Sequence, residues 1–113
     1  MKKLGLIGFP LGHSFSKKYY TQKFEDHQIQ GVDYDLYPIE QISTFAQLYL
    51  EDAQFYGFNV TIPYKQSVLA YMDELSAEAQ AMQAVNCIRI EKRENKPYLI
   101  GFNTDAYGFE QSL

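Results

Sequence analysis

Residue types that build metal sites and disulfides are scarce in this sequence. It contains one cysteine, two histidines and no tryptophan in 113 residues. A single cysteine, Cys87, cannot form an internal disulfide and is too few for a cysteine-based zinc site. The histidines, His13 and His27, are far apart and their spacing does not supply a ligand set. No metal centre is therefore predicted.

Long apolar runs and clusters of positive charge are also missing. No run approaches the length needed to span a membrane, and the N-terminus has no signal-peptide core. The net charge is −4 without a basic stripe, so nucleic acid is not an expected partner. The densest charge, in residues 91–95, is of mixed sign and is predicted to be a solvated loop. A cytoplasmic protein is the default expectation.

The remaining composition is typical of one globular domain. Hydrophobic residues make up 46% of the chain and charged residues 21%. The length suits a single core. Aromatic residues reach 16%, from ten Tyr and eight Phe, so rings can be buried while hydroxyl groups remain for polar partners.

Hydrophobic periodicity predicts strands that alternate with helices. Strands are expected at residues 3–9, 32–39 and 55–62, followed by a hairpin around the charged loop. The helices are expected from Ser14 or Ser16 to about 28, from about 41 to 52, from Pro63 through Met72, from Ser76 to about Met82, and at the end of the chain near Asp105. This order predicts an α/β three-layer sandwich, with a mixed, mostly parallel sheet of about five or six strands flanked by helices.

Two polar side chains interrupt the predicted strand in "FNVTIPYK", residues 58–65. Because side chains alternate in a strand, Asn59 and Thr61 should share one face, and Phe58, Val60 and Ile62 the other. The polar pair comes at the carboxyl end of the strand, where open α/β sheets bind ligands. The structural alternative is that Thr61 caps the next helix and Asn59 ties down a loop.

Lys65 favours the functional interpretation. It is predicted in the first turn of the helix that begins at Pro63, where the helix dipole disfavours a cation. That position would lower the pKa of the lysine from ~10.4 toward the range useful for proton transfer. The alternative is a solvated lysine that extends from the helix.

Four further side chains are candidates for chemistry. In "GFPLGHSFS", residues 8–16, Ser14 or Ser16 is suited to cap a helix, and the same geometry forms an anion site for carboxylate or phosphate. Neither GxGxxG nor a Walker lysine is present, so a nucleotide loop is not predicted. Asn86 interrupts the apolar "AVNCI", although asparagine is disfavoured in strands. Its amide is therefore expected to have a specific role, which is either contact with a ligand or only a buried hydrogen bond. Asp105 is suited either to cap the last helix or to take part in the site.

Four segments together resemble the N-terminal substrate-binding domain of shikimate dehydrogenase. They are "GFPLGHSFSKKYY", "GFNVTIPYK", "AVNCI" and "GFNTDAYGF", in the order and spacing of that family. The resemblance implies that residues 1–113 form the substrate-binding domain of an enzyme that reduces 3-dehydroshikimate to shikimate with NADPH, on the route to chorismate and the aromatic amino acids. A Rossmann domain that binds the NADP is expected to follow residue 113.

The resemblance also implies roles for individual residues. Ser14 and Ser16 would bind the substrate carboxylate, and Lys65 and Asp105 would act as a catalytic pair at the carbonyl and ring hydroxyls. Asn59, Thr61 and Asn86 would add polar contacts to the substrate. The sequence departs from the family pattern at Lys17, Tyr20, Gln83 and Cys87, and Lys17 adds a cation beside the expected carboxylate site.

Other functions stay open at this point. One alternative is a quinate/shikimate dehydrogenase that uses NAD or NADP, because the cofactor's 2′-phosphate would be recognised by the absent domain. An alternative of another class is a non-catalytic module that binds a hydroxylated cyclic acid. A fragment of this kind would have little activity alone and could self-associate through the surface meant for its partner domain.

Overall fold

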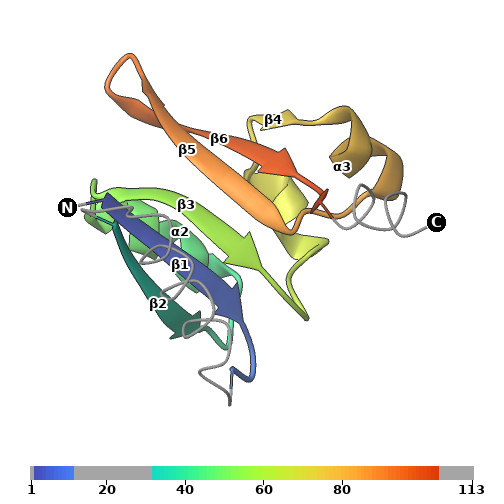
Figure 1. The fold of residues 1–113 in the computed structure, drawn as a ribbon, viewed down its shortest axis with the longest axis horizontal. Helices are drawn as coiled ribbons and strands as arrows, with labels where there is room; N and C mark the ends of the chain where they lie inside the picture. The colour runs from blue at the N-terminus through green and yellow to red at the C-terminus, as the bar shows by residue number, and fades with distance from the viewer. Residues whose placement is uncertain (1, 12–31, 105–113) are drawn as a thin grey trace.

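Six strands form one open, mixed sheet in a computed structural model that describes residues 2–11 and 32–104 (Figure 1). The strands are β1 (Lys2–Gly8), β2 (Val32–Pro38), β3 (Phe55–Val60), β4 (Glu74–Leu75), β5 (Cys87–Arg93) and β6 (Lys96–Phe102). Their order across the sheet is β2-β1-β3-β5-β6-β4. Three neighbouring pairs are parallel and two, β3–β5 and β5–β6, are antiparallel. The predicted mixed, mostly parallel sheet is confirmed.

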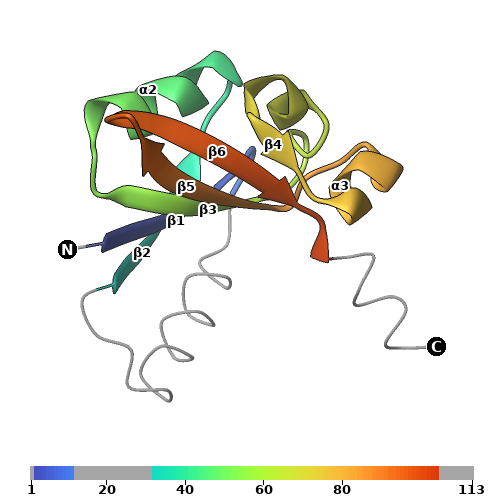
Figure 2. The same cartoon turned by 90° about the horizontal axis from the view of Figure 1, so that it is seen from above.

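Helices cover one face of this sheet. α2 (Ser43–Glu51) is separated from the strands by the core, and the 3₁₀ helix η1 (Ser67–Tyr71) packs beside it (Figure 2). Phe45 of α2 meets Phe58 of β3 with ring centroids 5.1 Å apart, and Tyr71 of η1 at 5.7 Å. The helix expected from Ser14 or Ser16 lies outside the described residues, as does the one expected near Asp105. None of the described helices is long and apolar enough to span a membrane.

A bulge in β3 decides which aromatic rings enter the core. Lys3 of β1 lies opposite Phe55, but the next residue, Leu4, lies opposite Gly57. The extra residue places Phe55 and Phe58 on the same face, where their rings stack with centroids 4.8 Å apart. Simple alternation would have sent these two rings to opposite faces.

The β5–β6 hairpin closes through a two-residue turn. Glu94 and Asn95 have φ values of 54° and 65°, which suits the tight turns that join twisted strands. The expectation of a loop over 91–95 is therefore wrong for residues 91–93, which belong to β5. Their mixed charges suit a strand with one exposed face, because opposite charges two residues apart lie side by side.

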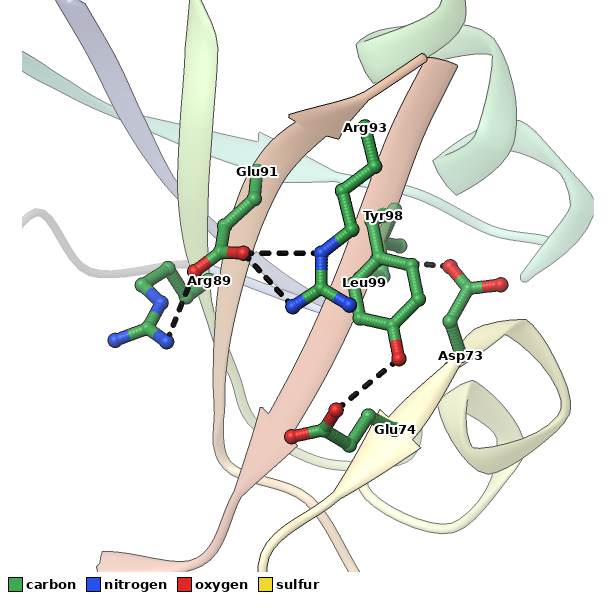
Figure 3. A network of polar contacts seen from close by, with 7 residues as sticks. All are labelled: Asp73, Glu74, Arg89, Glu91, Arg93, Tyr98 and Leu99. Atoms are coloured by element: carbon green, nitrogen blue, oxygen red, sulfur yellow. Dashed lines mark hydrogen bonds and ion pairs between the residues drawn. The ribbon is translucent and has the colours of Figure 1, made fainter.

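Figure 3 shows how this exposed face is held together. Glu91 forms ion pairs with Arg89 at 3.0 Å and with Arg93 at 3.1 Å, and the Arg93 guanidinium lies 3.6 Å from the centroid of the Tyr98 ring. The Tyr98 hydroxyl donates to Glu74 of β4 at 3.1 Å. Asp73 accepts a hydrogen bond from the backbone N–H of Leu99 at 2.8 Å, next to the short strand β4. The sequence analysis did not predict β4.

The segment after β3 is not the helix predicted from Pro63. Residues 62–66 form turns, the Ile62–Pro63 peptide is cis, and only η1 is helical before Met72 becomes extended. The Lys65 carbonyl accepts from the N–H of Val85 at 2.8 Å, which replaces a helical bond within the segment. By contrast, α3 (Ala77–Met82) begins as predicted, because the Ser76 hydroxyl accepts from the N–H of Ala79 at 3.1 Å and Glu78 lies in the first turn.

Candidate functional site

The predicted polar site residues that the structure describes lie together at one edge of the sheet, the edge that is formed by the ends of the strands and not by an outer strand. β1 and β3 are parallel and end at this edge, where the antiparallel β5 begins and β6 ends. Backbone hydrogen bonds join the three segments: Val60 N–H donates to the Asn86 carbonyl at 2.9 Å, and Asn86 N–H donates to the Phe102 carbonyl at 3.0 Å. This is the carboxyl-end position that the sequence analysis expected for a ligand site.

Asn59 is held by a strand two places away in the sheet. It is the last residue but one of β3 and is half-buried. Its amide nitrogen donates to the hydroxyl of Tyr34, in β2, at 3.1 Å. Asn59 therefore does not tie down a loop, and its partner Tyr34 was missed because no local pattern marks a tyrosine in a different strand.

Thr61 lies just beyond the end of β3, against β1. Its backbone N–H donates to the Ile7 carbonyl at 3.0 Å, and a methyl group added at Gly8 would fall 2.5 Å from the Thr61 Cγ2 atom. Thr61 does not cap a helix, because η1 starts after Gln66, which makes no side-chain cap bond. The prediction that Ile62 shares the apolar face of the strand is wrong. Its side chain is 71% exposed, because the strand alternation stops at Val60.

Lys65 is half-buried in the turn that precedes η1. The prediction that Lys65 lies at a positive helix terminus is wrong, because no α-helix begins at Pro63. What places Lys65 instead is the backbone bond from Val85, the neighbour of Asn86. The lysine is therefore anchored to the segment that begins β5.

Asn86 links the parts of this site. It lies immediately before β5 rather than inside it, which removes the objection to an asparagine in a strand. Its Nδ2 donates to the Thr104 hydroxyl at 2.9 Å and its Oδ1 accepts from the Thr104 N–H at 3.0 Å. The amide therefore does make hydrogen bonds within the protein, as one of the two interpretations expected. One N–H and one lone pair of the amide remain for a ligand.

The remaining predicted site residues, Ser14, Ser16 and Asp105, lie outside the described residues. Thr104, the last described residue, lies beside Asn86, whose Oδ1 accepts from its backbone N–H. Asn103 was missed by the sequence analysis. It is buried, and its amide donates to the Ala84 carbonyl at 3.1 Å, which fixes the chain on the other side of Thr104.

The one cysteine is part of the sheet at this edge. Cys87 lies opposite Asn59 across the β3–β5 pair, and burial raises the pKa of its thiol. A buried thiol that keeps its proton is a poor nucleophile, so Cys87 is assigned to packing. Within residues 2–11 and 32–104, no group of three or more His, Cys, Asp or Glu side chains could hold a metal ion.

Comparison with known proteins identifies the family. The family model described as "Shikimate dehydrogenase substrate binding domain" matches residues 6–88. A curated shikimate dehydrogenase (NADP(+)) from Clostridium perfringens is 41% identical over 116 residues, a match that covers 100% of this chain and 40% of the relative. The chain thus spans about 40% of the length of the curated relatives it matches.

Solved structures of this family share the fold. Shikimate dehydrogenase 1 from Peptoclostridium difficile has a TM-score of 0.84 and 36% identity, over 98% of this chain and 40% of that one. Shikimate 5-dehydrogenase from Thermus thermophilus, solved in complex with NADP(H) and shikimate, has a TM-score of 0.83 and 32% identity, over 100% of this chain and 41% of that one. The chain belongs to the shikimate dehydrogenase substrate-binding domain family.

Proposed function

We propose that this chain is the substrate-binding part of an NADP-dependent shikimate dehydrogenase, which interconverts 3-dehydroshikimate and shikimate. The observation that carries the proposal is the gathering of Asn59, Thr61, Lys65 and Asn86 at one sheet edge, joined by the Val85–Lys65 and Asn86–Thr104 hydrogen bonds. The relatives that match the whole chain are named for this activity.

The cofactor would be held mainly by a domain beyond this chain. The sequence has no glycine-rich dinucleotide loop, and the glycines at Gly5 and Gly8 lie inside β1 rather than between a strand and a helix. When bound, NADPH supplies the hydride. This chain supplies the groups that hold the ketone and handle the proton.

Proton transfer is assigned to Lys65. A carbonyl that receives hydride develops negative charge on its oxygen, which a protonated lysine stabilises and then neutralises by donating its proton. Asp105 would orient the ammonium group through its opposite charge. In the oxidation of shikimate, the same lysine would accept the hydroxyl proton.

Substrate orientation is assigned to polar groups on both sides of the lysine. Ser14 and Ser16 would bind the ring carboxylate, while Asn59, Thr61 and Asn86 would bind ring hydroxyls. The amides supply both donors and acceptors, which suits a polyhydroxylated ring. Ordered contacts of this kind hold the ketone in a reactive position.

The test is a comparison of substrates on the complete gene product, with its cofactor domain. Shikimate with NADP+ should give the highest kcat/KM among the combinations of shikimate or quinate with NADP+ or NAD+. Equal rates with quinate would favour a quinate/shikimate dehydrogenase. Binding of shikimate by calorimetry without turnover under any combination would identify a binding module and refute the proposal.

A further inference from the structure

One buried hydroxyl group touches the site from outside the four motifs. Tyr34, on β2, receives the Asn59 amide hydrogen bond at 3.1 Å, from a position 25 residues away in the sequence. We propose that Tyr34 is a positioning residue, which fixes the orientation of the Asn59 side chain toward the substrate. The inference rests on the proposed function and adds a residue to it.

The sheet register brings these two side chains together. On β1, Leu4 lies opposite Tyr34 and Leu6 lies opposite Asn59. Leu4 and Leu6 are two residues apart, so Tyr34 and Asn59 lie on the same face of the sheet. Their positions along the strands differ by two residues, and they lie on either side of β1. The long tyrosine side chain crosses that strand diagonally to reach the amide.

This face is opposite to the one that α2 covers. Phe58, the neighbour of Asn59, points into the core against Phe45, so Asn59 points the other way. Tyr34 is only 3% exposed and Leu6 only 8%. A ring this buried has little freedom, so its hydroxyl occupies a fixed place, and a buried hydroxyl is retained where it has hydrogen-bond partners.

The bond holds the end of the Asn59 side chain in one place. The terminal torsion of asparagine is soft, and its oxygen and nitrogen can exchange places at low cost when nothing distinguishes them. In this structure the Asn59 Nδ2 atom faces the Tyr34 hydroxyl, which leaves Oδ1 as an acceptor for a ligand. The second N–H of Nδ2 also remains, so the amide offers an acceptor and a donor, which suits a ring hydroxyl. Tyr34 therefore fixes the position from which the Asn59 amide meets the substrate.

The test is Tyr34→Phe in the complete enzyme, with the Asn59→Ala variant as a second background. The single variant should raise the KM for shikimate about tenfold, equivalent to about 1.4 kcal/mol, while kcat and the KM for NADP+ change less than about twofold. In the Asn59→Ala background, Tyr34→Phe should raise the KM for shikimate no further. General damage to the fold would lower the active fraction and hence kcat, so the split between KM and kcat separates positioning from stability.

Tyr37→Phe is the matched control. Tyr37 lies on the same strand but on the other face, where its ring packs against Phe55 with centroids 5.4 Å apart, so this variant should leave the KM for shikimate unchanged. If Tyr34→Phe raised the KM for shikimate by the same factor in both backgrounds, the positioning role of Tyr34 would be overturned while the proposed function would stand. The rate of the unmodified enzyme with shikimate and NADP+ is measured alongside. An inactive unmodified enzyme would overturn the proposed function and the role of Tyr34 with it.

Discussion

Asn86 and Thr104 hold each other through two hydrogen bonds, although 18 positions separate them in the sequence. One bond joins the amide nitrogen to the threonine hydroxyl, and the other joins the amide oxygen to the threonine backbone N–H. Because Val85 binds the Lys65 carbonyl, the same short segment also anchors the lysine. The backbone positions of Lys65 and Thr104 therefore depend on one another.

Removing the threonine hydroxyl should loosen this arrangement. Thr104→Val keeps the shape and the backbone bond but loses the bond from Asn86 Nδ2, with a net value of about 0.5–1.5 kcal/mol. We expect the KM for shikimate to rise roughly threefold to tenfold in the complete enzyme. Steady-state kinetics measures this. Thr44→Val, the same change on α2, is the control and should leave the KM unchanged.

Replacing the lysine should affect the chemical step. Lys65→Ala removes the proposed proton donor, so kcat should fall by about 10²–10⁴, the usual contribution of a general acid or base. The KM for shikimate should change much less. Lys92→Ala, on the exposed hairpin, controls for the loss of a positive charge. Near-normal turnover of the Lys65 variant would contradict its assignment as the acid and base.

A methyl group at Gly8 should disturb Thr61. An added Cβ would fall 2.5 Å from Thr61 Cγ2 and 3.0 Å from the Ile62 carbonyl oxygen. Gly8→Ala should therefore lower the free energy of unfolding by about 1–3 kcal/mol and raise the KM for shikimate. Urea denaturation and kinetics measure the two effects.

Gly5→Ala separates crowding from an effect on the site. Its Cβ would meet Tyr37 Cδ2 at 2.7 Å and Phe58 Cδ1 at 3.1 Å, on the core face of the sheet and away from Thr61. This variant should lose stability to a similar degree and keep its KM. Equal changes in KM for the two glycine variants would show that Thr61 has no specific part in binding.

The ion pair between Lys3 and Asp52 should make stability depend on pH in the acid range. The two charged atoms are 2.6 Å apart, and the hydrogen bond from Lys3 lowers the pKa of Asp52, assisted by the backbone N–H of Gln54. A carboxyl group with a lowered folded-state pKa stabilises the fold above its unfolded value of ~3.9, and this contribution disappears as the pH falls through the folded-state pKa.

Asp52→Asn should therefore lower the Tm slightly at pH 7 and not at all at an acid pH below the folded-state pKa of Asp52. The effect is small because both side chains are 31% exposed and solvent screens the pair. Thermal unfolding between these pH values measures it. In a Lys3→Met background, the same substitution should have less effect at pH 7, and an unchanged effect there would show that Lys3 is not the cause.

Local sequence signals were enough for the regular elements. The apolar stretches at 3–9 and 32–39, the helical spacing over 41–52 and the hairpin partners were all predicted near their observed bounds. Ser76 was correctly identified as a cap because its hydroxyl acts within three residues. These features depend on neighbours along the chain, so one sequence contains the required information.

Long-range contacts decided the places where the predictions were wrong. The helix expected from Pro63 does not form, because the Lys65 carbonyl binds Val85, 20 residues later. The bulge in β3 and the short strand β4 depend on the pairing of β1 with β3 and of β6 with β4. No local propensity reports such pairings.

The same division applies to the site. By itself, the sequence determined which side chains are predicted to carry the chemistry, because motif and spacing single out Asn59, Thr61, Lys65 and Asn86. Only the tertiary structure decided what holds them, because Tyr34 and Thr104 reach their partners across 25 and 18 positions of the chain. The physical reason is that a hydrogen bond between distant residues exists only when strand register brings donor and acceptor within about 3 Å.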